Sequence, residues 1–306
     1  MKKLRVPFFV MSLLILFPCF AAAAPLRVGI LPDADSLPFM VARDEGFFTR
    51  ENVEVELVSF FNPQERDAAI QAGRLDGAIS DLLAAAFFAA GGFDMKVTSL
   101  TDGRYGIVGS PVSNNRTLQG LRGKRIGLST NTIIQYTVDA LLGSAGIPIT
   151  GYDAVSVPRM PVRMEMVITG QLDAAGLPEP LLTAAVERGA VLLATTDTTG
   201  IDAGILLFSK KVLDSRLEDV RRFYRAYDKA AQKINADPDS YRDYLVEKAS
   251  FPAEVRDAYR FVTYRKPSLP ADDQIAGAIT WLKSRNLLSA DLRASDLVDT
   301  RAVAEW

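Results

Sequence analysis

A short unit that occurs twice constrains the fold of this chain more than any other feature. Gly73-Arg-Leu-Asp76 leads into an apolar run that ends at Ser80-Asp81, and Gly170-Gln-Leu-Asp173 leads into an apolar run that ends at Pro178-Glu179. In each copy a helix ends at glycine, a turn follows, and a short strand delivers a polar residue to the start of the next helix. The repeat predicts that one α/β unit is used twice, with ligand bound where each strand ends.

The segments around the repeat have the same order of predicted elements in both copies. β-rich runs alternate with helical periodicity, and helices are expected at 39–48, 63–72 and 162–169. Predicted strands lie at 26–31, 53–60 and 78–80 in the first copy and at 125–128, 155–158 and 174–178 in the second. This order predicts two similar α/β lobes, each with a parallel sheet covered by helices.

The remaining segments are predicted to connect the lobes. We expect crossovers near 103–110 and near 202–210, and a helical region from Leu217 onward with Phe223 and Tyr227 on its buried face. A long helical region needs a surface on which to pack, and lobe 1 is the simplest choice. The expected organisation is therefore lobe 1 over 24–105, lobe 2 over 106–205, and a return to lobe 1 with the helical C-terminal region over 206–306. Two crossovers would form a hinge.

Composition excludes several classes of function. The chain has 306 residues, 48% of them hydrophobic and 24% charged, and its net charge of −2 gives no basic excess for nucleic acid. It contains no histidine, which removes Ser-His-Asp and Cys-His catalysis and the usual zinc sites. We therefore expect no metal, no cofactor and no enzymatic activity.

Residues 1–23 have the pattern of a signal peptide. Lys2 and Lys3 precede an apolar run at 6–17, and Ala21-x-Ala23 supplies a cleavage site. The run is too short to span a bilayer core of about 30 Å, so we predict cleavage and a periplasmic location. Cys19 raises the alternative of a lipid anchor, but Phe17-Pro18 departs from the small residues such anchors require, and we interpret Cys19 as part of the signal.

Four further patterns, in this order and spacing, resemble a known family over the whole chain after the signal. They are Pro38-x-x-Val41-Ala42 with Glu45-Gly46-Phe47-Phe48 and Val53-x-Val55-Glu56; Gly73-x-Leu-Asp76; Leu121-x-Gly-Lys-x-Ile-Gly127; and Gly170-Gln-Leu-Asp173. The chain resembles the SsuA/THI5-like substrate-binding proteins of ABC importers for nitrate, sulfonates, taurine and thiamine precursors. The resemblance implies a type II periplasmic-binding-protein fold, a cleft between the lobes, and a permease and ATPase complex as partner. It leaves the solute open, and the enzymes of the same group depend on a histidine that this chain lacks.

Ligand is expected at helix starts that follow the carboxyl ends of strands, because free backbone N–H groups and the helix dipole meet there. An equally simple interpretation of each such residue is that it only caps its own helix, a role worth about 1 kcal/mol. The candidate ligand-binding residues are Asp35, Ser36, Phe39, Asn62, Ser80, Asp81, Arg104, Ser129, Thr130, Asn131, Thr132, Arg159, Glu179 and Asp202.

Several charged residues could be either structural or ligand-binding. Asp76 and Asp173 recur in the repeat but lie in turns at the far end of their strands, so we expect them to be structural. Arg66 and Arg163 also recur, within amphipathic helices, and are expected to face solvent. Arg104 and Arg159 are the cations that we expect near the cleft, where either could bind an anion with a forked pair of hydrogen bonds.

Acidic candidates outnumber basic ones, which favours a small organic solute with hydrogen-bond donors, such as an amine or a protonated heterocycle, over nitrate or a sulfonate. We therefore predict a monomeric, exported solute-binding protein that delivers its solute to an ABC permease. An exported enzyme on the same fold and a ligand-sensing module are the two alternatives.

Overall fold

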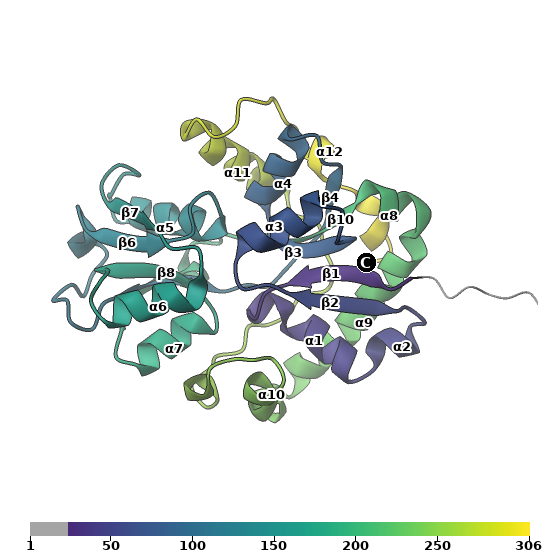
Figure 1. Cartoon of the computed structure of the whole chain (residues 1–306), viewed down its shortest axis with the longest axis horizontal. Coiled ribbons are helices and arrows are strands. Elements are labelled where there is room, and N and C mark those ends of the chain that lie inside the picture. The colour runs from purple at the N-terminus through teal and green to yellow at the C-terminus, as the bar shows by residue number, and fades with distance from the viewer. Residues whose placement is uncertain (1–23) are drawn as a thin grey trace, which may run out of the picture.

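The computed structural model describes residues 24–306, apart from the side chain of Thr198, so the predicted signal peptide and Cys19 lie outside the described residues. Within them the strands form two five-stranded sheets, which define lobe 1 and lobe 2 (Figure 1). The order in lobe 1 is β2 (Val55–Ser59), β1 (Leu26–Ile30), β3 (Gly77–Asp81), β10 (Gly204–Ser209), β4 (Met95–Leu100), and the order in lobe 2 is β7 (Asp153–Ser156), β6 (Arg125–Leu128), β8 (Ala174–Pro178), β5 (Tyr105–Gly109), β9 (Val191–Thr195).

The two sheets have the same topology, as the repeat predicts, but each sheet is mixed and not wholly parallel as expected. β2, β1 and β3 are parallel, and β10 runs antiparallel between β3 and β4. In lobe 2, β7, β6 and β8 are parallel, and β5 runs antiparallel between β8 and β9. Each antiparallel strand enters from the other lobe, β5 directly after β4 and β10 directly after β9. The crossovers therefore lie at 101–104 and 196–203, a few residues earlier than predicted, because 105–109 and 204–209 are strands.

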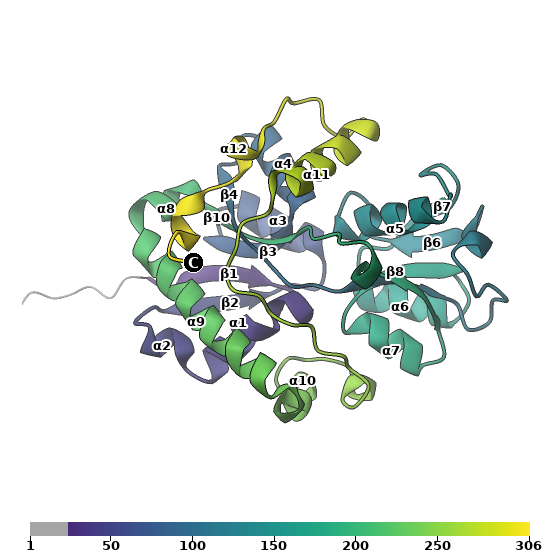
Figure 2. The same cartoon turned by 180° about the vertical axis from the view of Figure 1, so that it is seen from behind.

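Helices cover both faces of both sheets (Figures 1 and 2). Lobe 1 carries α1 (Leu37–Asp44), α2 (Phe47–Arg50), α3 (Pro63–Gln71) and α4 (Leu82–Ala90), and lobe 2 carries α5 (Ile133–Ser144), α6 (Met160–Ile168) and α7 (Leu181–Glu187). The helix predicted over 39–48 is divided into α1 and α2, because Gly46 adopts a left-handed φ of 71° that ends the first helix.

The C-terminal region contains α8 (Lys210–Ser215), α9 (Leu217–Ala236), α10 (Arg242–Glu247), α11 (Asp272–Ser284) and α12 (Ala294–Leu297). It packs on lobe 1 as predicted: α9 lies against α1, and Phe223 stacks on Phe39 with ring centroids 5.1 Å apart. It also reaches lobe 2, which the sequence did not indicate. Trp281 of α11 donates a 2.8 Å hydrogen bond from Nε1 to Asp139 of α5.

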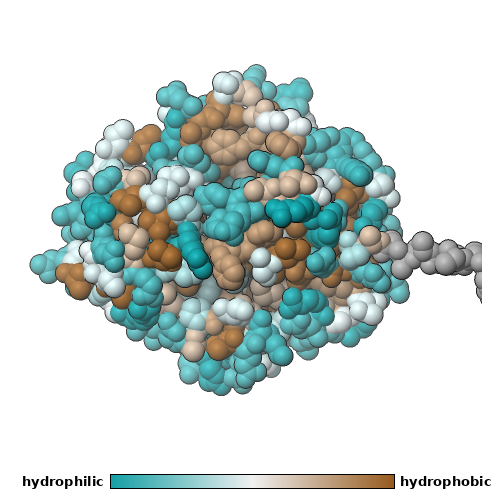
Figure 3. Space-filling view, viewed as in Figure 1, coloured by the Kyte–Doolittle hydropathy of each residue, from teal (hydrophilic) through white to brown (hydrophobic). Residues whose placement is uncertain are grey.

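Buried apolar side chains continue from one lobe into the other on both faces of the sheets. On one face the cluster under α1 and α9 extends to α6 and α7, and on the other the cluster under α3 and α4 extends to α5. The lobes meet without an open channel on the face shown in Figure 3. The structure is therefore a closed arrangement of the two lobes. None of the helices in residues 24–306 is long and apolar enough to cross a bilayer.

Candidate ligand-binding site between the lobes

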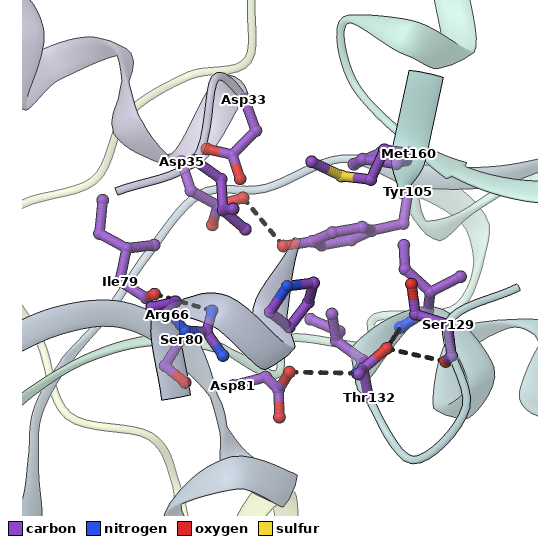
Figure 4. A pocket seen from close by; sticks show the side chains of 15 residues that line it. Asp33, Asp35, Arg66, Ile79, Ser80, Asp81, Tyr105, Ser129, Thr132 and Met160 are labelled. Atoms are coloured by element: carbon purple, nitrogen blue, oxygen red, sulfur yellow. Dashed lines mark hydrogen bonds between the residues drawn. The ribbon is translucent and has the colours of Figure 1, made fainter. Parts of the chain in front are cut away.

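A small cavity of about 30 Å³ lies where the lobes meet, at the carboxyl ends of the parallel strands. This is the edge at which open α/β sheets bind ligands. Lobe 1 contributes Asp33, Asp35, Arg66, Ser80 and Asp81 to its wall. Lobe 2 contributes Tyr105, Ser129, Thr132 and Met160, and Figure 4 shows the two groups facing each other. The cavity is far smaller than typical pockets for organic ligands, which measure about 300–1,000 Å³, so the lobes must separate to admit such a solute.

Two buried carboxylates follow β1. The side chain of Asp33 caps the turn that begins at Ala34, because its Oδ1 accepts hydrogen bonds from the backbone N–H and the hydroxyl of Ser36, at 3.1 and 2.8 Å. Asp35 accepts from Thr101 in the first crossover and, at 2.8 Å, from the Tyr105 hydroxyl in lobe 2. Burial raises the pKa of Asp33 well above its usual value and the pKa of Asp35 to about 6. Asp35 thus joins lobe 1, a crossover and lobe 2.

Asp81 also connects the lobes. Its Oδ1 caps α4 by accepting the Ala84 N–H at 2.8 Å, and its Oδ2 accepts the Ile133 N–H of α5 at 3.2 Å. One carboxylate therefore satisfies the N-termini of two helices, one in each lobe. Burial raises its pKa. The adjacent Ser80 hydroxyl is buried and has no hydrogen-bond partner in residues 24–306.

The lobe 2 wall is built around the start of α5. Thr132 caps this helix by accepting the Ile134 N–H at 3.2 Å, and its hydroxyl donates to the Ser129 carbonyl at 3.0 Å. Ser129 Oγ accepts a 2.8 Å hydrogen bond from Arg163. Thr130 and Asn131 belong to the same loop but lie outside this cavity: Thr130 contacts Ser156 at the surface.

The other candidates are placed apart from this cavity, and all of them except Arg159 have a structural role. Ser36 is buried between Asp33 and the Leu31 N–H, and Phe39 is in the core against Phe223. Asn62 caps α3 at 2.9 Å from the Glu65 N–H, and Arg159 is exposed at the start of α6. These contacts are the capping and packing interpretations that the sequence left open.

Three of the charged candidates are paired with charged partners. Arg104 lies 2.7 Å from Glu179 and also pairs with Asp197, and Glu179 accepts two further hydrogen bonds from Thr183. Asp202 pairs with Arg265 at 2.7 Å. Glu179 therefore does not face Asp81 across the cavity, although the two positions match in the repeat.

The prediction that Arg66 and Arg163 face solvent is wrong. Arg66 is 2% exposed and lines the cavity, and Arg163 is 0% exposed beneath Ser129. Each long side chain runs from its helix across a strand glycine, Gly29 or Gly127, toward the strand end. The recurrence of the two arginines, each matched by a glycine in a strand, was the signal that could have identified them. Asp33 and Met160 were also missed.

The prediction that the two repeated aspartates are structural is confirmed. Asp76 accepts the Arg27 N–H at 2.8 Å, and Asp173 accepts the Arg125 N–H at 2.9 Å. These bonds fix the start of β1 and of β6, at the opposite strand end from the cavity. Residues 24–306 contain no group of three or more acidic or cysteine side chains placed to hold a metal ion.

Solved structures show the same fold. The ligand-binding component of an ABC-type import system from Staphylococcus aureus, with zinc bound, has a TM-score of 0.80 and 17% identity, covering 92% of this chain and 99% of that one. The alkanesulfonate-binding protein SsuA from Xanthomonas axonopodis pv. citri, bound to MOPS, has a TM-score of 0.78 and 19% identity with the same coverage. The desulfurization enzyme DSZB has a TM-score of 0.65 and 13% identity over 90% of this chain and 96% of that one. At these identities the likeness establishes the periplasmic-binding-protein fold.

Sequence comparison identifies the family. A relative from Haemophilus influenzae that is named as a thiamine biosynthesis protein is 28% identical over 172 residues, 54% of this chain and 53% of the relative. The chain thus spans about half the length of this curated relative. The family model described as NMT1/THI5 like matches residues 33–241, more than half of the chain. The chain belongs to the NMT1/THI5-like family.

Proposed function

We propose that this chain is an exported solute-binding protein that captures a small organic solute between its lobes and delivers it to the permease and ATPase of an ABC importer. The observation that carries the proposal is the cavity itself, because both lobes build its wall at the ends of parallel strands and carboxylate and hydroxyl side chains are among its lining residues. The description of the Staphylococcus aureus protein as a ligand-binding component of an ABC-type import system supports it.

The charges in the cavity favour a solute with hydrogen-bond donors. Three buried carboxylates, Asp33, Asp35 and Asp81, line the cavity, whereas the cation that lines it, Arg66, is already paired with Asp67 at 2.8 Å. A carboxylate buried without a counter-charge is costly, and a cationic group offsets that cost. An amine or a protonated heterocycle fits this wall better than nitrate or a simple sulfonate.

Closure of the lobes would couple binding to delivery. Asp35–Tyr105 and Asp81–Ile133 are hydrogen bonds between the lobes at the cavity wall. A solute that contacts both walls binds the closed form more tightly than the open form and shifts the population toward closure. The permease would then recognise the closed arrangement of the two lobes.

A thermal-shift screen of the purified protein against amines, pyrimidines, amino acids, sulfonates and simple anions tests the proposal. A solute present at a hundred times its Kd adds about 2.7 kcal/mol of stability, which gives a clear rise in Tm. N-terminal sequencing of the exported protein is expected to begin at Ala24. Turnover of a compound without any Tm shift would contradict the proposal and favour the enzyme alternative, for which DSZB shows that the fold is suitable.

A further inference from the structure

Arg66 and Arg163 occupy equivalent positions in the two lobes. Each is the fourth residue of its helix, and each donates from Nη1 to a backbone carbonyl: Arg66 to Ile79 within β3 at 2.9 Å, and Arg163 to Val157 just after β7 at 2.7 Å. A Cβ added at Gly29 would lie 3.4 Å from the Cγ of Arg66. A Cβ added at Gly127 would lie 3.2 Å from the Cγ of Arg163. The repeat has thus placed one buried guanidinium behind each wall of the cavity.

The two guanidinium groups differ in their counter-charges. Arg66 pairs with Asp67, and its charge also offsets part of the rise in pKa that burial causes at the cavity carboxylates Asp33 and Asp81. Arg163 has no carboxylate partner in residues 24–306, and its Nε and Nη2 atoms are buried without hydrogen bonds. The buried carboxylates of lobe 2 are paired with other arginines, Asp139 with Arg285 and Glu179 with Arg104. Burial alone therefore acts on Arg163 and lowers its pKa to about 9.

This unbalanced charge acts on the cavity through Ser129. Arg163 Nη1 donates to Ser129 Oγ at 2.8 Å, so the Ser129 hydroxyl proton points away from Arg163. Its acceptor within the protein is the Pro158 carbonyl, at a long 3.4 Å. Ser129 lines the cavity. The lobe 2 wall therefore presents a hydroxyl donor polarised by a buried cation, opposite the carboxylate acceptors of lobe 1.

We propose that Ser129, positioned by Arg163, donates a hydrogen bond to an acceptor group of the solute, and that the solute is dipolar. Its cationic or donor group lies against Asp33, Asp35 and Asp81, and an oxyanion such as a carboxylate lies against Ser129. This inference rests on the proposed solute-binding function. A purely cationic solute leaves Arg163 without a counter-charge, and a purely anionic solute faces three carboxylates, whereas a dipolar solute balances both walls.

Isothermal titration calorimetry of the full protein with propylamine, propionate and β-alanine tests the inference, because the three probes share a three-carbon chain and differ in charge. We expect β-alanine to bind at least tenfold more tightly than either other probe. Arg163→Met removes the charge and keeps much of the side-chain volume, so β-alanine affinity is expected to fall about tenfold while propylamine affinity does not fall. Ser129→Ala leaves Arg163 in place and is expected to show the same selective loss.

Arg188→Met is the matched control, because Arg188 is a lobe 2 arginine that pairs with the surface residue Glu165 away from the cavity. It is expected to preserve the preference for β-alanine. Propylamine binding as tightly as β-alanine, or an equal loss of affinity for all probes in Arg163→Met, would overturn the dipolar inference and leave the solute-binding function standing.

If all three probes fail to bind, larger amines, oxyanions and zwitterions are compared by thermal shift. Hits confined to one charge type overturn the inference, zwitterionic hits weakened by Arg163→Met support it, and no hit in any class contradicts the proposed function itself.

Discussion

Single glycines show how closely the residues of this fold are packed. A Cβ at Gly77 in β3 would lie 2.5 Å from the Phe208 ring and 2.7 Å from the Leu207 carbonyl of β10, whereas a Cβ at Gly143 in α5 has no neighbour within 4 Å. We expect Gly77→Ala to destabilise the protein by about 1–3 kcal/mol through overpacking. Gly143→Ala is expected to stabilise it by about 0.5–1 kcal/mol, because glycine is unfavourable within a helix. Urea denaturation measures both, and equal stability of the two variants would contradict the packing argument.

The buried carboxylates make a prediction about pH. The pKa of Asp35 is raised from 3.8 to about 6, so between these values the folded protein holds a proton that the unfolded chain releases. The stabilisation is complete below about pH 4 and is lost as the pH rises through 6, on the order of 2–3 kcal/mol for this residue. Asp33 and Asp81 act in the same direction. The chain has no histidine to titrate in this range. Without solute, the free energy of unfolding in urea is therefore expected to be higher at pH 5 than at pH 7.

Two variants test the assignment of this pH effect. Asp35→Asn removes the titrating group and is expected to reduce the slope between pH 5 and pH 7. Asp197→Asn is the control, since pairing with Arg104 lowers the pKa of this surface carboxylate and its effect on stability belongs below about pH 4. An unchanged slope in Asp35→Asn would show that the proton is bound elsewhere.

At the scale of elements, Asp81 links the N-termini of α4 and α5. Asp81→Asn keeps one acceptor for the Ala84 N–H but turns an amide donor toward the Ile133 N–H, so the bond between the lobes is lost while the cap remains. We expect solute affinity to fall by roughly tenfold, because a hydrogen bond to a charged group is worth about 1.5–3 kcal/mol.

Calorimetric titration of a solute found in the screen measures the effect of Asp81→Asn. Asp173→Asn makes the same chemical change in a turn at the far strand end, where the side chain accepts a hydrogen bond from Arg125 N–H, and is expected to leave affinity unchanged. Unchanged solute affinity in Asp81→Asn would show that Asp81 only caps α4 and has no role in binding.

At the scale of the whole molecule, α11 provides a reporter of lobe movement. It packs on α4 of lobe 1, while Trp281 and Arg285 hold Asp139 of lobe 2. Any hinge motion must change one of these contacts. In Trp306→Phe, Trp281 is the one tryptophan left of the two in the chain. We expect solute to shift its fluorescence to shorter wavelength as closure buries the ring. Asp139→Asn, which removes the charge that Arg285 binds, is expected to reduce this response, and a solute that binds without changing Trp281 emission would contradict the closure argument.

Much of the fold could be predicted from local sequence signals. The repeat predicted two similar lobes with crossovers, the periodicity of 217–236 identified the buried face of α9, and turn chemistry assigned Asp76 and Asp173 correctly. These features depend on residues near one another in the sequence or on one face of one element. For the candidate site, Asp35, Ser80, Asp81, Ser129 and Thr132 were predicted and line the cavity. Prediction was weaker elsewhere because a helix cap and a ligand-binding residue have the same sequence pattern.

By itself, the sequence determined that a repeated α/β unit builds two lobes and that histidine chemistry is absent. Both can be recognised without knowing which residues are in contact in the folded protein. The tertiary structure decided which strand ends meet and which charges remain unpaired. Arg66 and Arg163 lie on helices whose pattern assigned them to solvent, yet each crosses a glycine, Arg66 to line the cavity and Arg163 to lie beneath Ser129. Glu179 matches Asp81 in the repeat but is neutralised by Arg104. Side-chain reach and charge pairing depend on neighbours far away in the chain, and only the packed lobes bring those neighbours together.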